Sequence, residues 1–586
     1  MKIIRDCPEN FTCKPGMIEV LLFTLRLTQA IAITFDRVLL IVYFASGCKA
    51  FKKKEIVMIH INQVAFGKNS SKSAVITGEG KECIVVSADT KIKLFPEVSE
   101  PKFDEASGDT VRTVDFSEIN KPGEYFIFSD GLKKTFYIKD EPYRELTNAL
   151  VKGMYYQRCG TALEEKHAGV YKHKPCHLGK STLESDKTVK TDATGGWHDA
   201  GDYGKYVLAG AVAVAHILYA YELFPKAFED NLNIPESGNG IPDVLNECRY
   251  ELEWILKMQD ESGGVYHKTA TRFFAPFIMP EDDLEELVLF DISHTATATF
   301  AAVCALSYRC YKNIDADFAD KMLAGAVKAW KWLENNPGFK PFINPPNVNS
   351  GEYGDDNGDD ELFWAAAELF TTTGEEKYKK VMGELVEKVD ISRLGWRDVG
   401  GIGAMSCLFG KGEQDPEFVS GLRKRFITAA DDILALCDNS GYGTALSPGG
   451  YVWGSILPIM SNAIVLICAN LLSENAAYIN AAQSQLDYML GKNAVGYCFV
   501  SGFGQNPVRY LHHRPSFADG TDDPVPGLVS GGPNNLSPDE ACKEIIPQGT
   551  PPAKFFIDHT ETASANENAI YWNSPAIFAA AYFSVN

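Results

Sequence analysis

Residues 456–468 read Ile-Leu-Pro-Ile-Met-Ser-Asn-Ala-Ile-Val-Leu-Ile-Cys, a run that is apolar at almost every position. A helix of this composition has no face for water, so it belongs inside a larger helical body. From Pro142 to the C-terminus the apolar residues keep a helical period, with long loops between the periodic segments. Helices in pairs with functional loops describe an α/α barrel of six hairpins, and an irregular helical bundle is the alternative. The candidate helices are residues 143–156, 203–223, 242–259, 293–311, 317–333, 361–370, 375–389, 403–408, 417–436, 455–472, 476–490 and 574–583.

A different pattern precedes this helical part. Between Ile59 and Ile138 short β-rich runs alternate with turn residues such as Lys121-Pro122-Gly123, which is typical of an immunoglobulin-like sandwich. No cluster of catalytic residue types lies here, so a packing module is favoured over a carbohydrate-binding one. The sequence therefore predicts a mainly α protein with a small all-β domain at 58–140 and an (α/α)6 barrel at 141–586. The candidate strands are residues 59–66, 74–76, 83–86, 91–94, 110–114, 124–128 and 134–138.

The composition limits the partners. The chain has 586 residues, 45% of them hydrophobic, and a formal net charge of −21. A chain of this length and apolar content buries a large core. Its negative charge argues against a nucleic acid or an anionic membrane surface as partner, because both attract basic faces. A neutral or cationic ligand is the better match, and no protein partner is evident.

The cysteines and the N-terminus bear on localisation. The 14 cysteines are scattered through the chain without a regular disulfide spacing, which favours a reducing compartment. Residues 1–57 form an extension in which Arg37–Cys48 resembles a short lipoprotein signal. The alternative is that translation starts at Met58. We expect a cytoplasmic protein if Met58 is the true start, and a secreted or lipid-anchored one if the extension is a signal.

The densest chemistry lies in Gly195–Tyr206, which holds two carboxylates, an imidazole and three aromatic rings among glycines. Asp199 and Asp202 stand three positions apart, so at a helix start or tight turn both point the same way and can hold one water between them. A carboxylate pair around a water is the chemistry of a general base. The alternative interpretation is an aspartate N-cap followed by a second turn aspartate.

Two more clusters lie far downstream. His512 and Arg514 follow a glycine-rich turn and offer donors to a hydroxyl-rich ligand, unless they form an ordinary surface turn.

Asp558 precedes Glu567, a single glutamate beside the pair Tyr571-Trp572. An apolar environment would raise the pKa of Glu567 and keep it protonated near neutral pH. The alternative is a carboxylate that interacts with a helix dipole. Aromatic side chains available for stacking on a flat ligand are Trp197, Tyr203, Tyr206, Trp453, Tyr571 and Trp572.

In their order along the chain, the aspartate pair, His-x-Arg and the segment Asn566–Ser574 resemble glycoside hydrolase family 9, the inverting cellulases with an α/α six-hairpin barrel. The resemblance covers nearly everything after Met58 and includes an N-terminal immunoglobulin-like domain. It implies that Asp202 is the general base, that Asp199 helps to hold the water and that Glu567 is the general acid. It also implies that His512 and Arg514 bind sugar. Among the aromatic candidates we expect Trp453 and Tyr571 at the substrate, and Asp558 in a supporting position. Ala563 departs from the family pattern, which usually has an aromatic residue there.

Cys159, Cys176, His177 and His198 are borderline-soft ligands of the kind that favour tetrahedral zinc. Their wide spacing alone is equally consistent with chance, and the resemblance implies a structural zinc near these positions. Residues 236–243 and 355–360 offer oxygen ligands for calcium, as loops of the family do, although solvated acidic turns explain them equally well. No organic cofactor is expected.

The expected function is hydrolysis of β-1,4-glucosidic bonds in cellulose, cellodextrins or related β-glucans, with inversion at the anomeric carbon. The first alternative is an exo-β-glucosaminidase acting on chitosan oligosaccharides, whose cationic substrate suits an acidic protein. The second is a catalytically silent carbohydrate-binding protein on the same barrel. Endo and exo cleavage are not distinguished by loop lengths.

Overall fold

The computed structural model describes residues 57–78, 82–410, 412 and 415–586. The lipoprotein-like segment at 37–48 therefore lies outside the described residues, as does nearly all of the predicted extension. No helix in the described ranges is long and apolar enough to cross a membrane. The cysteines in these ranges are all buried and free of disulfides.

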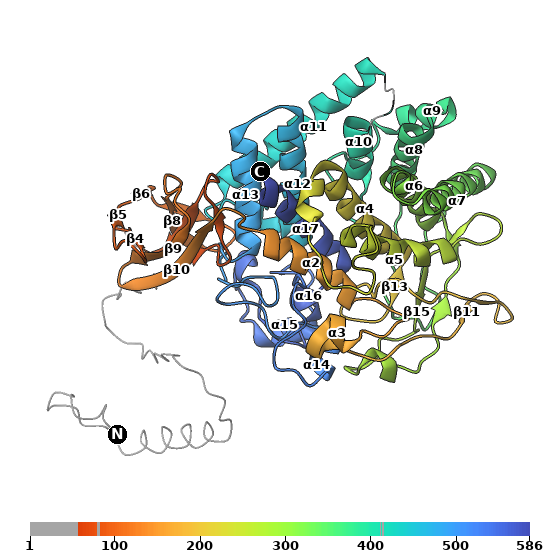
Figure 1. The fold of residues 1–586 in the computed structure, drawn as a ribbon, viewed down its shortest axis with the longest axis horizontal. Helices are drawn as coiled ribbons and strands as arrows, with labels where there is room; N and C mark the ends of the chain where they lie inside the picture. The colour runs from red at the N-terminus through yellow and green to blue at the C-terminus, as the bar shows by residue number, and fades with distance from the viewer. Residues whose placement is uncertain (1–56, 79–81, 411, 413–414) are drawn as a thin grey trace, which may run out of the picture. The chain divides into compact units, whose positions relative to one another are not determined.

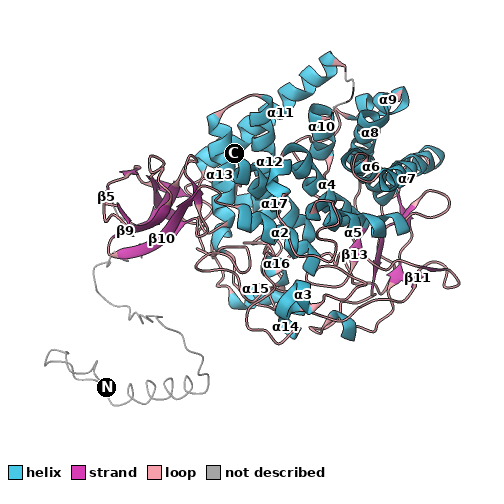
Figure 2. Ribbon diagram, viewed as in Figure 1, coloured by secondary structure: helices cyan, strands magenta, loops and turns pink. Residues whose placement is uncertain are grey.

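The N-terminal strands form two antiparallel-rich sheets that enclose a small apolar core, which confirms the predicted sandwich (Figure 2). One sheet has the order β1-β3-β8-β6 with β7 beside β8, and the other has the order β2-β10-β9-β4-β5. Three phenylalanines, Phe66, Phe116 and Phe136, pack ring to ring between them. The strands are β1 (Ile59–Ile61), β2 (Phe66–Gly67), β3 (Ser73–Thr77), β4 (Ile84–Ser87), β5 (Lys93–Leu94), β6 (Glu97–Val98), β7 (Lys102–Asp104), β8 (Asp109–Asp115), β9 (Gly123–Ser129) and β10 (Leu132–Lys139).

The predicted single strand at 59–66 is in fact two strands in different sheets, β1 and β2. The break at Asn62-Gln63 has a physical reason, because both side chains bond to the helical domain. The Asn62 amide donates to Asp487 Oδ1 at 2.8 Å and to the Tyr143 hydroxyl at 3.0 Å. Gln63 Nε2 donates to the Gly496 carbonyl at 2.9 Å. These buried bonds attach the sandwich to the barrel.

Among the described residues after Tyr143, the long helices form six hairpins, which confirms the predicted barrel (Figure 1). The inner helices are apolar almost all round: every residue of α4 from Val207 to Ala220 is buried. The outer helices have one apolar face, as expected for helices that cover a core on one side. The inner helices are α4 (Val207–Leu223), α6 (His294–Tyr311), α8 (Asp359–Thr373), α10 (Gly400–Phe409), α12 (Ile456–Leu472) and α17 (Ile570–Val585). The outer helices are α2 (Arg144–Tyr156), α5 (Asp243–Lys257), α7 (Ala316–Asn335), α9 (Glu376–Leu385), α11 (Pro416–Asn439) and α13 (Ala476–Met489).

One predicted helix begins too early. The pattern predicted a helix from Tyr203, but α4 starts at Val207, because Lys205 and Tyr206 form strand β13 and pair with Thr269 and Lys268. Sequence periodicity did not reveal the small sheet to which β13 belongs, since its strands are two or three residues long. The order of this sheet is β12 (Lys190–Thr191), β11 (Ser181–Leu183), β16 (Val288–Leu289), β15 (Lys268–Ala270) and β13 (Lys205–Tyr206). A two-stranded sheet joins β14 (Val265–Tyr266) and β17 (Ile292–Ser293).

Short helices lie in the loops that connect the hairpins, on the side that carries the polar clusters. The α-helical ones are α3 (Glu165–Ala168), α14 (Arg514–Ala518), α15 (Glu540–Ile545) and α16 (Ala563–Asn566).

Candidate active site

The two aspartates lie in an irregular turn before β13. The main chain of Asp199 is held on both sides: its amide donates to the Gly204 carbonyl at 2.9 Å and its carbonyl accepts from the Ile570 amide at 2.8 Å. Asp202 Oδ2 accepts the Gly204 amide at 2.9 Å. Neither aspartate caps a helix, because α4 begins at Val207 without a side-chain cap. The N-cap alternative therefore does not apply.

Glycine is required at position 201 for this arrangement. A side chain there would meet the His512 carbonyl oxygen at 1.8 Å, so the turn with the two aspartates could not pack against residues 512–513. The Arg514 amide uses this close approach to donate to the Gly201 carbonyl at 3.1 Å. Two segments more than 300 positions apart in sequence thereby form one wall of the site.

Glu567 lies between α16 and α17, ahead of the first helical residue of α17, Ile570. Its main chain is fixed by a bridge to His512 and by the Gly531 amide, which donates to the Glu567 carbonyl at 2.9 Å. Burial raises the pKa of the Glu567 carboxyl well above its usual range, and the charge of Asp202 raises it further. Both effects favour the protonated form of this carboxyl.

The three carboxylates share one cavity of about 330 Å³. Its walls combine acidic groups with aromatic rings, which is the composition of a sugar-binding cavity. Trp453 is 47% exposed at its edge, whereas Tyr571 is buried in its wall. The residues that line the cavity are Asp199, Ala200, Asp202, Tyr206, Phe274, Gly351, Glu352, Tyr353, Trp396, Trp453, Glu567 and Tyr571.

Tyr353 contacts the aspartate pair directly, and the sequence analysis missed it. Its hydroxyl donates to Asp199 Oδ2 and lies 3.2 Å from the Tyr571 hydroxyl. Asp199 Oδ1 is buried without a hydrogen-bond partner. Burial raises the pKa of Asp199 well above its usual range, the Tyr353 hydrogen bond opposes this rise, and the charge of Asp202 adds to it. A lone tyrosine 154 positions downstream carries no local signal of such a contact.

His512 and Arg514 lie beside the cavity but are not among the residues that line it. Arg514 is almost fully buried, and its guanidinium donates to the carbonyls of Gly201 at 2.8 Å and Ala275 at 2.7 Å. His512 Nδ1 donates to the Thr560 carbonyl at 2.7 Å. In this structure Arg514 therefore braces the turn that carries Asp202, a role that residue type and spacing do not reveal.

Asp558 connects the second and third clusters of the sequence. Its carboxylate accepts the amides of Arg509 at 2.8 Å and Tyr510 at 2.9 Å, and the Asn566 side-chain amide at 2.8 Å. It contacts neither aspartate of the cavity wall. These bonds place the segment before His512 against the residue that precedes Glu567.

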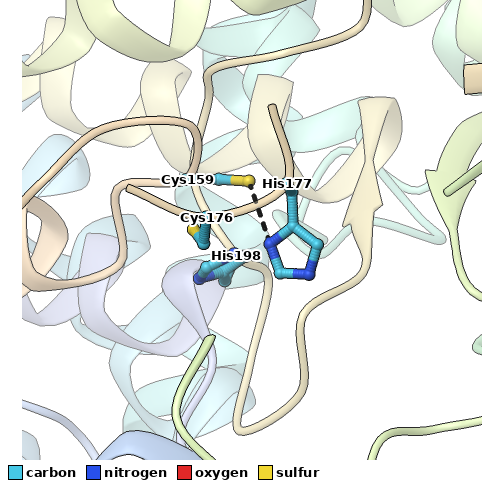
Figure 3. A group of neighbouring side chains, drawn as sticks. All are labelled: Cys159, Cys176, His177 and His198. Atoms are coloured by element: carbon cyan, nitrogen blue, oxygen red, sulfur yellow. Dashed lines mark hydrogen bonds between the residues drawn. The ribbon is translucent and has the colours of Figure 1, made fainter. Parts of the chain in front are cut away.

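The four predicted metal ligands come together next to the aspartate turn (Figure 3). Their ligand atoms all lie within 4.8 Å of one another. His177 Nδ1 is 3.8 Å from Cys159 Sγ, while its Nε2 is 3.4 Å from Asp283 Oδ2, the arrangement in which a carboxylate orients a metal-bound imidazole. His198 Nε2 is buried without a partner. Two thiols and two imidazoles with an orphaned ring nitrogen fit a tetrahedral metal site.

The two predicted calcium segments differ in the structure. In the first, both carboxylate oxygens of Glu236 accept bonds from Arg158, and Asp243 Oδ2 accepts from Leu232 and Ser237. In the second, Asp355 Oδ2 is buried without a donor among the described residues, as are both carboxylate oxygens of Glu361, the residue that follows the segment.

Burial raises the pKa of Asp360 to about 6 and that of Glu361 well above its usual range. Among the described residues, carboxylate oxygens without a partner therefore remain at Asp355 and Glu361, whereas Asp360 Oδ2 accepts the Val399 amide at 2.8 Å.

A barrel of six hairpins whose cavity is lined by carboxylates and aromatic rings defines a glycoside hydrolase, because the site rather than the barrel carries the chemistry. Profiles of two families match the sequence: the cellulase N-terminal ig-like domain over residues 56–134 and glycosyl hydrolase family 9 over residues 143–580. The chain belongs to glycosyl hydrolase family 9.

Individual relatives match nearly the whole of their own length. A cellodextrinase of Butyrivibrio fibrisolvens is 39% identical over 539 residues, which cover 89% of this chain and 98% of that protein. A solved endoglucanase from Alicyclobacillus acidocaldarius has a TM-score of 0.85 and 33% identity, covering 90% of this chain and 99% of its own. A zinc-binding triple mutant of a family 9 endoglucanase also has a TM-score of 0.85, with 32% identity and coverage of 89% and 99%.

Proposed function

We propose that this glycoside hydrolase cleaves β-1,4-glucosidic bonds in cellulose, cellodextrins or related β-glucans and inverts the anomeric centre. The observation that supports this most is the shared cavity, which is lined both by Glu567, a carboxyl with a raised pKa, and by the aspartate pair Asp199 and Asp202. Inversion requires a protonated acid on one side of the glycosidic oxygen and a base with its water on the other face of the sugar. The relatives described as a cellodextrinase and an endoglucanase support the substrate class.

The proposed roles follow from the environments of the three carboxyls. Glu567 gives its proton to the leaving oxygen, because its raised pKa keeps that proton available near neutral pH. Asp202 takes a proton from the attacking water. Asp199 shares that water and is kept in place by the hydroxyl of Tyr353. The proton on Glu567 is regained from solvent after the alcohol leaves.

Aromatic side chains are proposed to hold the glucan. Trp453, Trp396 and Phe274 line the cavity and offer ring faces to the sugar, with Tyr571 beside the aspartates. His512 is half-buried next to Glu567, where its imidazole can bind a sugar hydroxyl. For Arg514 we propose an indirect role, since its guanidinium already bonds to main-chain carbonyls.

A structural zinc is proposed at Cys159, Cys176, His177 and His198. When bound, zinc supplies a fixed tetrahedral link and no reaction step. Main-chain bonds already connect the two sides of this cluster. The Cys159 amide donates to the Gly196 carbonyl at 2.7 Å, and the His198 amide donates to the Gln157 carbonyl at 2.7 Å. A calcium ion is proposed beside Asp355 and Glu361, whose carboxylates include oxygens without a donor among the described residues.

A second candidate, exo-β-glucosaminidase activity, draws support from the charge of the cavity. Four acidic side chains line it, those of Asp199, Asp202, Glu352 and Glu567, of which Glu567 is proposed to be protonated, and no lysine or arginine is among the described residues that line it. A cationic sugar would gain from this charge.

The test uses cellodextrins, chitosan oligosaccharides and β-glucan with the purified protein. Proton NMR of the first product reports its anomeric configuration, and chromatography reports the sugar released. We expect α-configured products from cellodextrins. Release of glucosamine without action on cellodextrins would establish the second candidate, and β-configured first products would refute the proposed mechanism.

A further inference from the structure

A buried lysine lies directly behind the cavity wall. Lys268, in β15, is fully buried and pairs across the small sheet with Tyr206. Its ammonium donates to Gly351 O at 2.6 Å and Asn344 Oδ1 at 2.7 Å, with Ser350 Oγ and O at 3.2 and 3.3 Å. All four acceptors are uncharged. The lysine therefore holds the turn at 344–351 by its charge and its donors together.

The turn held by Lys268 leads into Tyr353. The backbone of Tyr353 has φ of +48°, a conformation that a non-glycine residue adopts only where its surroundings enforce it. Two more bonds act on the same turn: the Gly351 amide donates to the Tyr206 hydroxyl at 3.0 Å, and His267 Nε2 donates to the Glu352 carbonyl at 2.9 Å. The ring of Tyr206 also packs on that of Tyr353, with centroids 4.4 Å apart.

The hydroxyl of Tyr353 donates to Asp199 Oδ2, so the contacts form a continuous path from Lys268 to the aspartate pair. A cation in a dry interior is costly, and neutral donors could satisfy the same carbonyls. The negative charges of Asp202 and Glu352 stabilise the positive charge of Lys268 at this position. Burial lowers the pKa of Lys268 to about 7, and these two charges oppose that fall.

We propose that Lys268 is a positioning residue, which fixes Ser350 and Gly351 so that the strained Tyr353 donates its hydrogen bond to Asp199. The inference rests on the proposed role of Asp199 in holding the water. Lys268 itself touches no reacting atom. It acts through the turn, and its loss is expected to free the Tyr353 backbone and weaken the bond to Asp199.

The test combines Lys268→Met, Tyr353→Phe and the double variant. Because the path ends at the carboxylate that holds the attacking water, its loss should slow the chemical step and leave substrate binding nearly unchanged. We expect each single variant to lose about tenfold in kcat, with a KM close to that of the wild type. The kcat of the double variant should be no lower than that of the less active single variant, because both changes break the same path.

The matched control is Lys328→Met, since Lys328 also donates to a main-chain carbonyl, that of Asp260, but is exposed. It should behave like the wild type. Losses that multiply in the double variant, or a loss in Lys268→Met that appears in KM and not in kcat, would overturn the proposal. Thermal melts verify that each variant folds.

If Lys268→Met does not fold, Asn344→Ala takes its place, because it removes one acceptor of the ammonium and leaves the lysine in position. A smaller loss of kcat at an unchanged KM is then expected, and a wild-type kcat refutes the proposal. The proposed function fails separately, if the wild type does not hydrolyse cellodextrins. In that case kcat and KM are measured on whichever β-glycoside the wild type cleaves.

Discussion

Replacing Glu567 by glutamine tests the assignment of Glu567 as the general acid and Asp202 as the general base. The amide keeps the size and hydrogen-bonding capacity of the acid but cannot give up a proton. Burial and the charge of Asp202 hold the pKa of Glu567 well above its usual range. The wild-type acid is therefore protonated near neutral pH, and the variant lacks that proton at every pH.

The size of the effect follows from the leaving group. A positioned general acid contributes about 10² to 10⁴ in rate, which corresponds to about 2.7–5.4 kcal/mol. Cellodextrins leave as poorly acidic alcohols, so Glu567→Gln should lose this full factor in kcat. An activated aryl glycoside needs little proton donation and should be cleaved at most of the wild-type rate. Asp202→Asn should lose activity on both substrates, because it affects the attacking water.

The assay compares kcat for a cellodextrin and for a 2,4-dinitrophenyl cellobioside at the same pH. Glu352→Gln is the matched control, since Glu352 lines the same cavity but has no assigned proton transfer. It should reduce both rates by a similar, small factor. If Glu567→Gln and Asp202→Asn lost activity on the aryl glycoside equally, the assignment of acid and base would be wrong.

Three further predictions concern stability. Cys176→Ser or a strong chelator should lower the melting temperature and the rate together while activity persists in part, because the barrel has its own core. Zinc below about a tenth of an equivalent in fully active protein, by elemental analysis, would refute the metal site. Calcium should raise the melting temperature more at pH 8 than at pH 5. Because the pKa of Glu361 is raised in the folded state, ionisation of Glu361 destabilises the fold as the pH rises above the pKa of an unfolded glutamate. A bound cation offsets that cost. Glu361→Gln should abolish this dependence in calorimetry, and an unchanged calcium response in that variant would exclude the site. Asn62→Ala removes two buried bonds between sandwich and barrel, and should reduce the free energy of unfolding by about 1–3 kcal/mol in denaturant titrations. An effect no larger than that of the exposed Lys68→Ala would contradict this role.

Local sequence determined much of the architecture. The inner helices could be predicted because burial on all sides leaves an uninterrupted apolar run, as in α12. The sandwich could be predicted because short β-rich runs alternate with turn residues. The metal cluster and the cavity carboxylates were found from unusual residue types, such as the paired Asp199 and Asp202. The apolar runs and the paired Asp199 and Asp202 are signals contained within a few neighbouring positions, whereas the metal cluster spans Cys159 to His198 and its prediction also depended on the family resemblance.

Other features arose only from contacts between distant segments. Tyr353 and Lys268 carry no local mark of function, yet folding brings both to the wall behind Asp199. Arg514 was expected to face sugar, and its guanidinium instead braces Gly201. The small sheet that contains β13 was not predicted, because strands of two or three residues are too short to show an alternating apolar pattern. Hydrogen bonds are satisfied by whichever partner the fold brings within about 3 Å, so tertiary structure alone decides which polar side chains serve the site.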